Sequence, residues 1–397
     1  MNFDAATIRN WARVFGPAWL VMMADIDIAS IVTGLQAGAT WGYRMVFVML
    51  VLILPLFVIQ DAAGRLGTAG GMGLGEAIYR FFGRRIAVAS ALPMAISDFL
   101  EYVAEYAGIA IGLYLIGIPV FLGLLVAFAI HTFIVLGRQY REAEIILLPL
   151  SFIVVASILV SVFLFHVDVS RLVSEGLSPF QPYGDPSFQF LMAASIGAVV
   201  MPWMLYFHSG ADSRKKLQVA DLKLERLETL VGAVVSEILM AVIVIDGAHL
   251  VSSGDFLNPE EIGRALSPLG ASAPLLMGVG FLFAGFLALV VISLGSAWGA
   301  LEALGKSSRR AFLAVYATES LPALALVILI GNYVQLMLNL MVLYTIIIIP
   351  SLVLMGKLIS NPKVMNGRQY GRGEMVVYWL MSAMVVAGGI VGLSSLF

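Results

Sequence analysis

The sequence predicts an all-α membrane protein of about eleven transmembrane helices. Of its 397 residues, 60% are hydrophobic and only 12% are charged, whereas about a quarter of the residues of a soluble domain are charged. The apolar residues fall into blocks of roughly twenty, which is the length that crosses a hydrocarbon core about 30 Å thick. Because the chain has no cysteine, a disulfide framework and a thiolate metal site are both excluded.

Eleven apolar segments of this length are predicted. They lie near residues 14–38, 43–60, 87–114, 118–136, 143–166, 188–211, 229–250, 271–300, 311–330, 333–356 and 375–396. The linkers at 61–84, 167–187, 212–227, 251–268 and 357–374 are too short for soluble domains, so residues 1–397 are expected to form a single transmembrane domain. Residues 1–13 are short and amphipathic, and the helix that follows them is expected to stay in the protein rather than be cleaved as a signal.

The positions of Lys and Arg predict the orientation, because cytoplasmic loops carry the excess of these residues. With the N-terminus in the cytoplasm, Arg44, Arg171 and Arg264 fall on the outer side, and the other 20 of the 23 basic residues fall on the inner side. A helix miscounted in the middle of the chain would destroy this bias. The sequence therefore predicts a multi-pass protein of a bacterial inner membrane, with its N-terminus in the cytoplasm and its C-terminus outside.

The first and sixth segments share a weak internal similarity. The first contains Gly16-Pro17 and the polar stretch 25–30, and the sixth contains the stretch 197–203, so that polar or helix-breaking residues lie midway along each. An offset of five spans gives the two halves of the chain opposite topologies. Inverted repeats with interrupted first helices are typical of a large class of secondary transporters, which bind their substrates at the interruptions.

Asp25 and Asp27 lie in the middle of the first apolar segment. A carboxylate at the centre of a lipid-facing helix costs roughly 3 kcal/mol, so both side chains are expected to face a cavity or a partner. On a continuous helix, residues two apart point about 200° from each other. Only one of them can therefore face a given site unless the helix unwinds between them. Asp27 is the preferred ligand, and the alternative is that one of the two forms a structural ion pair.

In the sixth segment, Pro202 removes a backbone donor and disturbs the turn before it. This pattern predicts either a simple kink or a true break, and the flanking Met201 and Trp203 favour a break. Carbonyl groups freed at such a break can bind cations. The Met201 thioether suits a transition metal better than magnesium, although most methionines of membrane helices only pack. His208 is expected to cap the helix or to pack near the inner exit of this segment.

The third segment carries Asp98, Glu101 and Glu105. Glu101 and Glu105 are four residues apart and share a helix face, and two carboxylates on one buried face raise each other's proton affinity. The pair is therefore predicted to form a proton path or to pair with arginines of the cytoplasmic side. The remaining acids of the spans are predicted to have structural, packing or vestibule roles: Glu144, Glu237, Asp246 and Glu302.

Motifs in the first, third, fifth and sixth segments form a recognisable set. They are Gly16-Pro17-Ala18-Trp19-Leu20-Val21, Thr33-Gly34-Leu35-Gln36-Ala37-Gly38 with Trp41-Gly42-Tyr43, Glu105-Tyr106-Ala107-Gly108, Tyr140-Arg141 with Glu144, and Gly197-Ala198-Val199-Val200-Met201-Pro202 with Leu205-Tyr206-Phe207-His208-Ser209. Over nearly the whole chain the set resembles the NRAMP family of metal transporters (natural-resistance-associated macrophage proteins). The resemblance implies a LeuT-type fold, in which residues 12–166 and 188–356 are inverted five-helix repeats and 375–396 is an extra helix.

The chain departs from the family at the signature positions. The family's first-helix Asp-Pro-Gly-Asn aligns with Asp27-Ile28-Ala29-Ser30, its sixth-helix Met-Pro-His with Met201-Pro202-Trp203, its third-helix acidic pair with Tyr102 and Glu105, and its tenth-helix glutamine with Leu343. The resemblance thus implies Asp27 and Met201 as metal ligands. It implies as further substrate-binding residues Ser30, Trp203, Asp25 and Thr33. Loss of the histidine removes a group that titrates near neutral pH.

Two functions remain open from the sequence. The first is a secondary transporter that moves a divalent cation, Mg²⁺ or Mn²⁺, inward by alternating access, with Asp27 as the main charge on the ion and Glu101 and Glu105 as candidates for a proton path. The second is transport of a non-metal substrate such as bicarbonate or another small solute, which the loss of metal ligands suggests.

An enzyme is not expected, because the sequence has no HExxH or GxSxG motif and its four histidines are scattered. No resident cofactor and no nucleic-acid partner are expected. The expected partners are the lipid bilayer, the transported ion or solute and, as a candidate co-substrate, protons.

Overall fold

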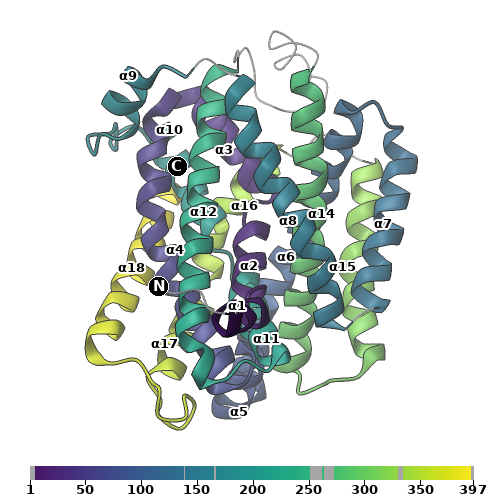
Figure 1. The fold of residues 1–397 in the computed structure, drawn as a ribbon, viewed down its shortest axis with the longest axis vertical. Coiled ribbons are helices and arrows are strands. Elements are labelled where there is room, and N and C mark those ends of the chain that lie inside the picture. Colours follow the sequence, from purple (N-terminus) through teal and green to yellow (C-terminus); the bar gives the residue numbers. More distant parts are fainter. Residues whose placement is uncertain are drawn as a thin grey trace.

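The computed structural model describes residues 5–394 except for 138, 165–166, 251–261, 263–271 and 330–333. Within these ranges every regular element is a helix (Figure 1), which confirms the predicted all-α class. Arg138, Arg264, His166 and nearly all of the predicted linker 251–268 lie outside the described residues, so the predictions made for them are not considered further.

Ten helical stretches of the described part are long and apolar enough to cross a membrane. One of them, Ile28–Gly70, turns at Gly42, where φ is +61°, and contains two spans, so the prediction of about eleven helices is confirmed. The spans are α2 (Pro17–Ala24) with α3 (Ile28–Trp41), α4 (Val46–Arg65), α6 (Arg84–Leu115), α7 (Val120–Gly137), α8 (Tyr140–Ser161), α10 (Pro186–Val199) with α11 (Pro202–Lys215), α12 (Leu222–His249), α14 (Ser272–Ala303), α15 (Arg309–Leu329), α16 (Val334–Ile347) with α17 (Ile349–Ile359), and α18 (Arg372–Ser394).

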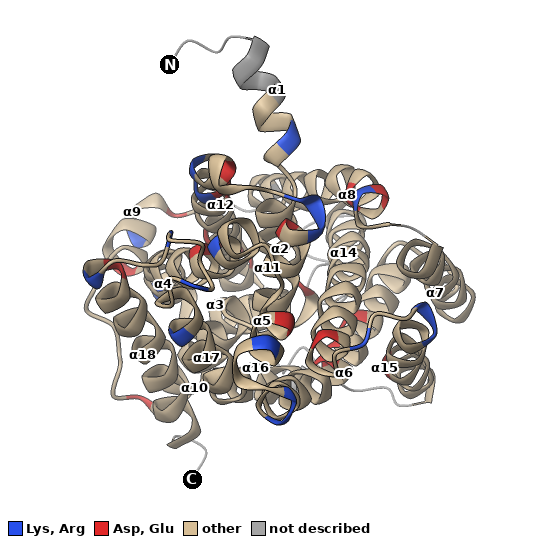
Figure 2. Ribbon diagram, turned by 90° about the horizontal axis from the view of Figure 1, so that it is seen from below, with Lys and Arg blue, Asp and Glu red and all other residues tan. Residues whose placement is uncertain are grey.

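Short helices connect or precede these spans. They are α1 (Ala5–Val14), η1 (Gly42–Met45), η2 (Leu66–Gly70), α5 (Leu74–Phe82), η3 (Val162–Leu164), α9 (Val169–Arg171), η4 (Leu172–Gly176) and η5 (Val219–Asp221). Figure 2, which views the bundle along its length, shows α1 projecting beyond the rim of the other helices. The predicted repeat boundaries, 12–166 and 188–356, stay predictions.

Two of the spans are interrupted, as the sequence suggested. The first is broken between α2 and α3, which lie one above the other at the centre of the bundle (Figure 1). The second is broken between α10 and α11, where Val200 and Met201 adopt extended backbone angles. The hydroxyl of Ser30 donates a hydrogen bond of 3.3 Å to the carbonyl oxygen of Ala198. The two breaks therefore lie next to each other, although they are about 170 residues apart in the sequence.

Glycines of α6 allow close helix contacts around these breaks. A Cβ atom at Gly112 would lie 2.7 Å from the carbonyl oxygen of Gly278, so α6 and α14 approach closely at this point. A Cβ atom at Gly108 would lie 2.1 Å from the Cγ1 atom of Ile28. Ile28, the first residue of α3, is thus seated directly on α6.

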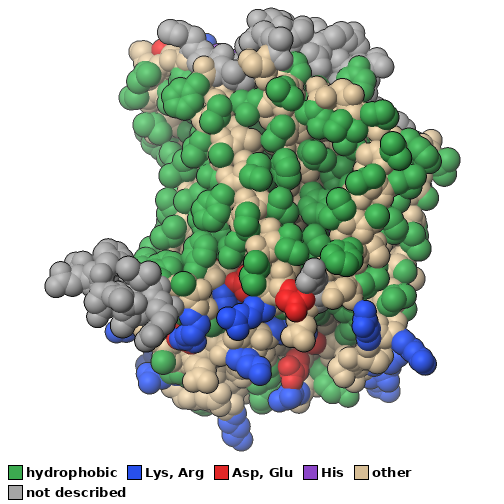
Figure 3. Space-filling view, turned by 45° about the vertical axis from the view of Figure 1, so that its right-hand side comes forward, with side chains coloured by type: hydrophobic (Ala, Val, Ile, Leu, Met, Phe, Trp, Pro, Cys, Tyr) green, Lys and Arg blue, Asp and Glu red, His purple; other side chains and the backbone are tan. Residues whose placement is uncertain are grey.

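The surface divides into an apolar belt and one basic end. Figure 3 shows a broad face of hydrophobic side chains with Lys and Arg gathered below it. Among the large apolar side chains that remain exposed are Phe121, Leu122, Ile145 and Leu380, as expected of residues that face lipid. We call the charged region below this belt the basic end. It includes the side chains that line two pockets, Arg80, Arg214, Lys306 and Arg309 in one and Arg65, Lys223, Arg226 and Arg368 in the other.

Candidate cation site

Asp27 lies at the break in the first span and begins α3. Its backbone is extended, and its Oδ1 atom accepts a hydrogen bond of 2.7 Å from the backbone N–H of Ser30. This is the arrangement of an N-cap residue, for which aspartate is among the preferred types. The helix therefore breaks without the Pro-Gly pair of the family motif, because the Asp27 side chain satisfies an N–H group that the break leaves without a helical partner.

Three carboxylates from two helices meet at this break. Asp27, Glu101 and Glu105 each offer an oxygen atom, and these atoms lie within 4.8 Å of one another. All three side chains are fully buried. The Oδ2 atom of Asp27, the Oε1 atom of Glu101 and the Oε2 atom of Glu105 have no hydrogen-bond partner among the described residues. Buried carboxylates that face one another in this way repel, so the arrangement requires protons or a cation between them.

The other oxygen atoms of the two glutamates are held by specific donors. Glu105 Oε1 accepts a hydrogen bond of 3.2 Å from the backbone N–H of Ile28, so the N-terminal end of α3 also orients this side chain. Glu101 Oε2 accepts a hydrogen bond of 2.6 Å from the hydroxyl of Tyr344 on α16. In the described part of the chain, no Lys or Arg forms an ion pair with either glutamate, so the predicted pairing with cytoplasmic arginines is not found there.

Asp25 faces a different helix. Its Oδ2 atom accepts a hydrogen bond of 3.0 Å from the hydroxyl of Ser236 on α12, whereas Asp27 faces α6. The next residue on α12, Glu237, is buried, and neither of its carboxylate oxygens has a hydrogen-bond partner among the described residues. The two aspartates thus have different surroundings. Because the span is interrupted between Ala24 and Ile28, the geometry of a continuous helix does not apply to them, and the ligand role of each stays a prediction.

The structure places the other predicted ligands at or beside the two breaks. Ser30 bridges to Ala198, but Thr33 donates its hydroxyl to the carbonyl oxygen of Ala29 on its own helix, at 2.7 Å. Met201 is the fully buried N-cap residue of α11. Pro202 is the first residue of this helix, where its missing N–H costs nothing. The sixth span is therefore truly broken rather than kinked.

Trp203, in the first turn of α11, is fully buried, and its indole N–H has no hydrogen-bond partner among the described residues. It occupies the position at which the sequence comparison placed the histidine of the family motif. A tryptophan offers no lone pair to a metal ion, so this position contributes packing and a hydrogen-bond donor rather than a ligand.

Tyr344 was missed by the sequence analysis. The tenth-helix position aligned there with the family's glutamine is Leu343, but 44% of the Leu343 side chain is exposed on the outer face of the helix. The alignment of Leu343 with a ligand position is therefore not supported, and the next residue faces the site instead. Successive helical residues point about 100° apart, so an error of one position in the alignment exchanges the buried face for the lipid face.

His131 is a partnered core residue rather than a ligand. Its Nδ1 atom lies 3.1 Å from the hydroxyl of Tyr106 and 3.2 Å from that of Tyr316, and its Nε2 atom lies 2.8 Å from the hydroxyl of Ser293. Both ring nitrogens are thus engaged in a network between α6, α7, α14 and α15. Asp98 is buried on the same helix as Glu101, but it is not among the three carboxylates that meet at the break.

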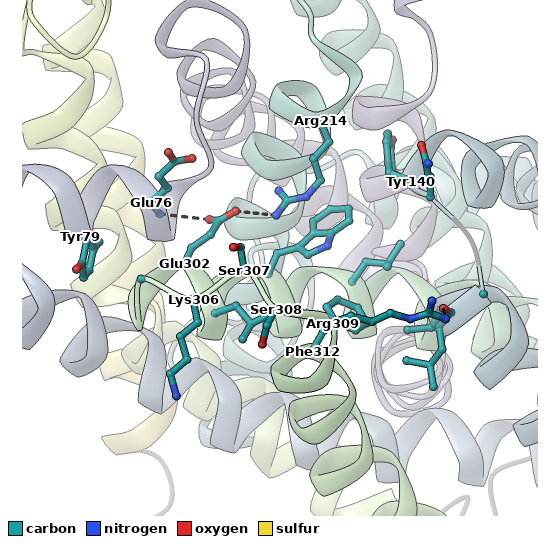
Figure 4. Close-up of a pocket in the computed structure, with 18 of the residues that line it drawn as sticks. Glu76, Tyr79, Tyr140, Arg214, Glu302, Lys306, Ser307, Ser308, Arg309 and Phe312 are labelled. Atoms are coloured by element: carbon teal, nitrogen blue, oxygen red, sulfur yellow. Dashed lines mark hydrogen bonds and ion pairs between the residues drawn. The ribbon is translucent and has the colours of Figure 1, made fainter.

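A vestibule opens at the basic end below the break. Its volume is about 930 Å³, and Arg214 donates a hydrogen bond of 2.9 Å to Glu302 across it (Figure 4). Tyr140 and Trp298 line its inner wall, and Phe207 packs against both of them. Phe207 stacks on Trp298 at 5.7 Å, and Tyr140 packs edge-on against both rings. Because Phe207 follows Met201 by six residues on α11, these rings lie between the vestibule and the break.

Toward the opposite end, the cavity beside α3 is small. It has a volume of about 20 Å³ and is lined by Ile31, Ser161 and Asp246 among others, which is room for about one water molecule. None of the three carboxylates lines this cavity or the vestibule. Glu302 lies in the vestibule, in agreement with its predicted role, and Glu144 forms an ion pair with Lys215.

Two interrupted helices whose breaks meet around buried carboxylates define a membrane protein of the LeuT type. The chain belongs to the natural resistance-associated macrophage protein-like family, whose sequence model matches residues 18–395. This confirms the resemblance that the motifs indicated.

Two curated relatives carry the name divalent metal cation transporter MntH. The protein of Bacillus subtilis is 28% identical over 399 residues, which cover 96% of this chain and 91% of that protein. The protein of Agrobacterium fabrum is 29% identical over 306 residues. That alignment covers 73% of this chain and 66% of the relative, so the matched region spans slightly less than two thirds of its length.

Solved structures share the fold. The manganese transporter of Eremococcus coleocola, in complex with an aromatic bis-isothiourea substituted compound, superposes with a TM-score of 0.83 at 20% identity, over 100% of this chain and 88% of that one. MhsT in complex with L-phenylalanine superposes with a TM-score of 0.65 at 12% identity, over 96% of this chain and 98% of that one. At these identities the similarity establishes the LeuT-type architecture and nothing about the substrate.

Proposed function

We propose that this chain transports a divalent cation across a bacterial inner membrane by alternating access, with Mg²⁺ or Mn²⁺ as the ion. One observation carries the proposal, namely the three buried carboxylate oxygens of Asp27, Glu101 and Glu105 that face one another at the helix break. The names of the MntH relatives support the same class of substrate.

The chemistry of the site favours a hard cation. Carboxylate oxygens suit Mg²⁺ and Mn²⁺, and Mg²⁺ in particular often binds through one or two carboxylates while it keeps several waters. Ser30 and the carbonyl groups at the two breaks would complete the shell. Met201 would add a soft sulfur ligand, which favours Mn²⁺ over Mg²⁺.

The charge of the site suggests a role for protons. Three ionised carboxylates carry three negative charges, and a divalent cation neutralises two of them. One proton on Glu101 or Glu105 would make the loaded site neutral. Protons would also have to replace the ion when it leaves, because three buried and unpaired carboxylates repel one another. Glu101 and Glu105 would thus serve as ion ligands and as proton acceptors in turn.

Release of the ion requires movement of the aromatic rings. Tyr140, Phe207 and Trp298 would have to separate in order to connect the break with the vestibule, and α11 would move with Phe207. With the basic end in the cytoplasm, as the distribution of Lys and Arg predicts, this movement releases the ion inward. The N-terminus would then lie in the cytoplasm and the C-terminus outside.

An anionic substrate such as bicarbonate fits this site poorly, because it would have to approach three carboxylates that have no basic partner in the described part of the chain. We propose a transporter rather than an enzyme, in line with the names of the relatives.

Ion uptake into proteoliposomes tests the proposal. Asp27→Asn should reduce the uptake of both Mn²⁺ and Mg²⁺ by about 100-fold, because it removes a buried charge on the ion. Glu175→Gln is the matched control, since Glu175 pairs with Arg171 far from the break, and it should transport like the parent. Uptake by Asp27→Asn at the parental rate, or uptake of bicarbonate with no uptake of either cation by the parent, would overturn the proposal.

A further inference from the structure

A second cluster of metal-binding side chains lies between the break and the basic end. His208 and Asp212 are one turn apart on α11, and Glu225 is on α12. One atom of each lies within 4.8 Å of the other two, and each side chain is at most 1% exposed. His208 follows Met201 by seven residues, so the cluster is displaced from the break by about 10 Å along α11.

The imidazole of His208 lies between an amide oxygen and the two carboxylates. Its Nδ1 atom lies 3.1 Å from the Oε1 atom of Gln60 on α4, and an amide oxygen can only accept, so Nδ1 carries the proton. Nε2 faces the two carboxylates, at 3.3 Å from Glu225 Oε1 and 3.9 Å from Asp212 Oδ2, and in the neutral imidazole with Nδ1 protonated this nitrogen offers a lone pair to a cation bound between them. Histidines that bind metals usually donate the other ring N–H to an oxygen in this way.

Among the described residues, no Lys or Arg forms an ion pair with Asp212 or Glu225, although Lys215, which pairs with Glu144, also interacts electrostatically with Asp212. Nearby carboxylates of this end are compensated: Glu228 by the backbone N–H groups of Gly16 and Trp19, Glu144 by Lys215, Asp221 by Arg13, and Asp61 by Arg226 and Tyr370. Burial raises the pKa of the Tyr370 hydroxyl well above its usual value, so this group keeps its proton and continues to donate to Asp61.

The hydrogen bonds that Asp212 and Glu225 accept come from hydroxyl groups. Asp212 accepts a hydrogen bond of 3.0 Å from Thr68, and Glu225 accepts one of 2.8 Å from Thr229. The Oδ1 atom of Asp212, the Oε2 atom of Glu225 and the Nε2 atom of His208 have no hydrogen-bond partner among the described residues. The oxygens nearest to His208 Nε2 are the ones that the two hydroxyl groups engage, Asp212 Oδ2 and Glu225 Oε1. Buried carboxylates that keep an unpartnered oxygen are costly unless a positive charge lies beside them.

Glycine at position 64 makes room for the cluster. A Cβ atom at Gly64 would lie 1.9 Å from Glu225 Oε1 and 3.0 Å from the Cε1 atom of His208. The absence of a side chain allows α4 to pack against both ligands. Gln60 of α4 and Thr68 of η2, which directly follows α4, orient them. Helices α4, α11 and α12 thus converge on the cluster, and the groups that position its ligands come from α4, η2 and α12.

We propose that His208, Asp212 and Glu225 form a second divalent-cation site, which prefers a transition metal such as Mn²⁺ to Mg²⁺. The imidazole nitrogen gives this preference, because Mg²⁺ takes almost exclusively oxygen ligands whereas Mn²⁺, Fe²⁺ and Zn²⁺ accept a mixture. An ion at this site cross-links α11 to α12 and holds the inner half of the broken span in place. The inference does not depend on transport at Asp27, since the two sites share no residue.

Manganese binding to the full-length protein in detergent tests the inference. The background is Asp27→Asn, which disables the first site, and the probe is Mn²⁺ alone. Pulsed electron paramagnetic resonance should show coupling of the bound Mn²⁺ to a ¹⁴N nucleus, because the first site contains no histidine among its described ligands. His208→Gln in this background should abolish the coupling and weaken Mn²⁺ binding by about 100-fold.

His131→Gln is the matched control, because His131 is a buried histidine whose two ring nitrogens are already engaged, and it should retain the coupling. Glu225→Gln gives a second test, since the nitrogen ligand remains but Mn²⁺ binding should weaken, which equilibrium dialysis measures. A hundredfold excess of Mg²⁺ should leave the nitrogen-coupled Mn²⁺ bound.

Absence of nitrogen coupling in Asp27→Asn at saturating Mn²⁺, or its persistence in His208→Gln, would overturn the second site. Neither result would affect the uptake test of Asp27.

Discussion

The hydroxyl of Tyr344 on α16 donates a hydrogen bond of 2.6 Å to Glu101 on α6. It also lies 3.3 Å from the carbonyl oxygen of Ser97, one turn earlier on the same helix. This contact fixes one oxygen of Glu101 and leaves the other directed at Asp27 and Glu105. Tyr344 therefore acts on the site by positioning Glu101, because its own oxygen is already engaged.

Tyr344→Phe should weaken cation binding while the fold is kept. Loss of the donor leaves a buried carboxylate oxygen unpaired, which costs roughly 1–3 kcal/mol, and loss of a group that orients a ligand typically lowers metal affinity about tenfold or more. The KM for Mn²⁺ uptake into proteoliposomes should rise by about tenfold. Tyr316→Phe, which removes a buried tyrosine hydroxyl from the His131 network, is the control and should leave this KM within about twofold. Equal effects of the two variants would show that Tyr344 has no specific role at the site.

The contact between Gly108 and Ile28 predicts a steric variant with a rescue. Gly108→Ala would place a methyl group against the β-branched side chain of Ile28 and push the start of α3 away from α6. The hydrogen bond between Glu105 and the Ile28 N–H would then lengthen. Overpacking of this kind costs roughly 1–3 kcal/mol, so Mn²⁺ affinity should fall by about tenfold.

Ile28→Ala removes the atoms that the new methyl group would meet. The double variant Gly108→Ala, Ile28→Ala should therefore recover most of the lost affinity, and a double-mutant cycle measured by Mn²⁺ binding would give a favourable coupling energy between the two positions. Gly373→Ala, at an exposed position where a Cβ atom has no neighbour, is the control. Purely additive effects at positions 108 and 28 would contradict the steric explanation.

Much of this architecture could be predicted from local sequence. Pro202 marked the break in the sixth span, and the two aspartates marked the middle of the first. Whether the first span is truly broken could not be decided, since Ile28 and Ala29 are compatible with a helix. The break depends partly on a tertiary contact, because Glu105 on α6 accepts the N–H of Ile28, and no pattern within residues 14–38 contains that information.

The partners of the site residues were harder to predict for the same reason. Tyr344 and Glu101 are more than 240 residues apart in the sequence. The alignment with the family's glutamine pointed to the exposed Leu343, one position before Tyr344. The cluster at His208 joins residues of three helices. From the sequence, a capping or packing role was predicted for His208 alone, and Asp212 and Glu225 fell within the predicted linker 212–227. Only the packing of α4 against α11 and α12 brings the three together.

Met201 offers a test of which ion the first site prefers. If its thioether binds the ion, Met201→Ala should lower the affinity for Mn²⁺ by about tenfold and leave that for Mg²⁺ almost unchanged, because sulfur is a poor ligand for Mg²⁺. Competition of each ion against a fixed Mn²⁺ concentration in an uptake assay measures both values. Met355→Ala, at a fully buried methionine of α17, is the control. Equal losses for both ions would indicate that Met201 supports the site by packing.

The three aromatic rings at the inner wall of the vestibule predict a change in access. Phe207→Ala removes the ring that stacks on Trp298 and packs against Tyr140, while the contact of Arg214 with the Trp298 ring at 4.0 Å is kept. Aromatic pairs contribute roughly 1 kcal/mol each, so loss of two should shift the equilibrium between closed and open vestibules by about tenfold or more.

The chain has no cysteine, so a single Met201→Cys substitution provides the only thiol with which to measure this shift. A small maleimide added from the side of the basic end should react with this thiol about tenfold faster when Phe207→Ala is also present. Phe152→Ala is the control, because Phe152 stacks on Trp19 at the lipid-facing surface, and it should not alter the rate. An unchanged rate in the Phe207→Ala protein would mean that the path from the break to the basic end does not pass these rings, and that the vestibule in Figure 4 is not the exit.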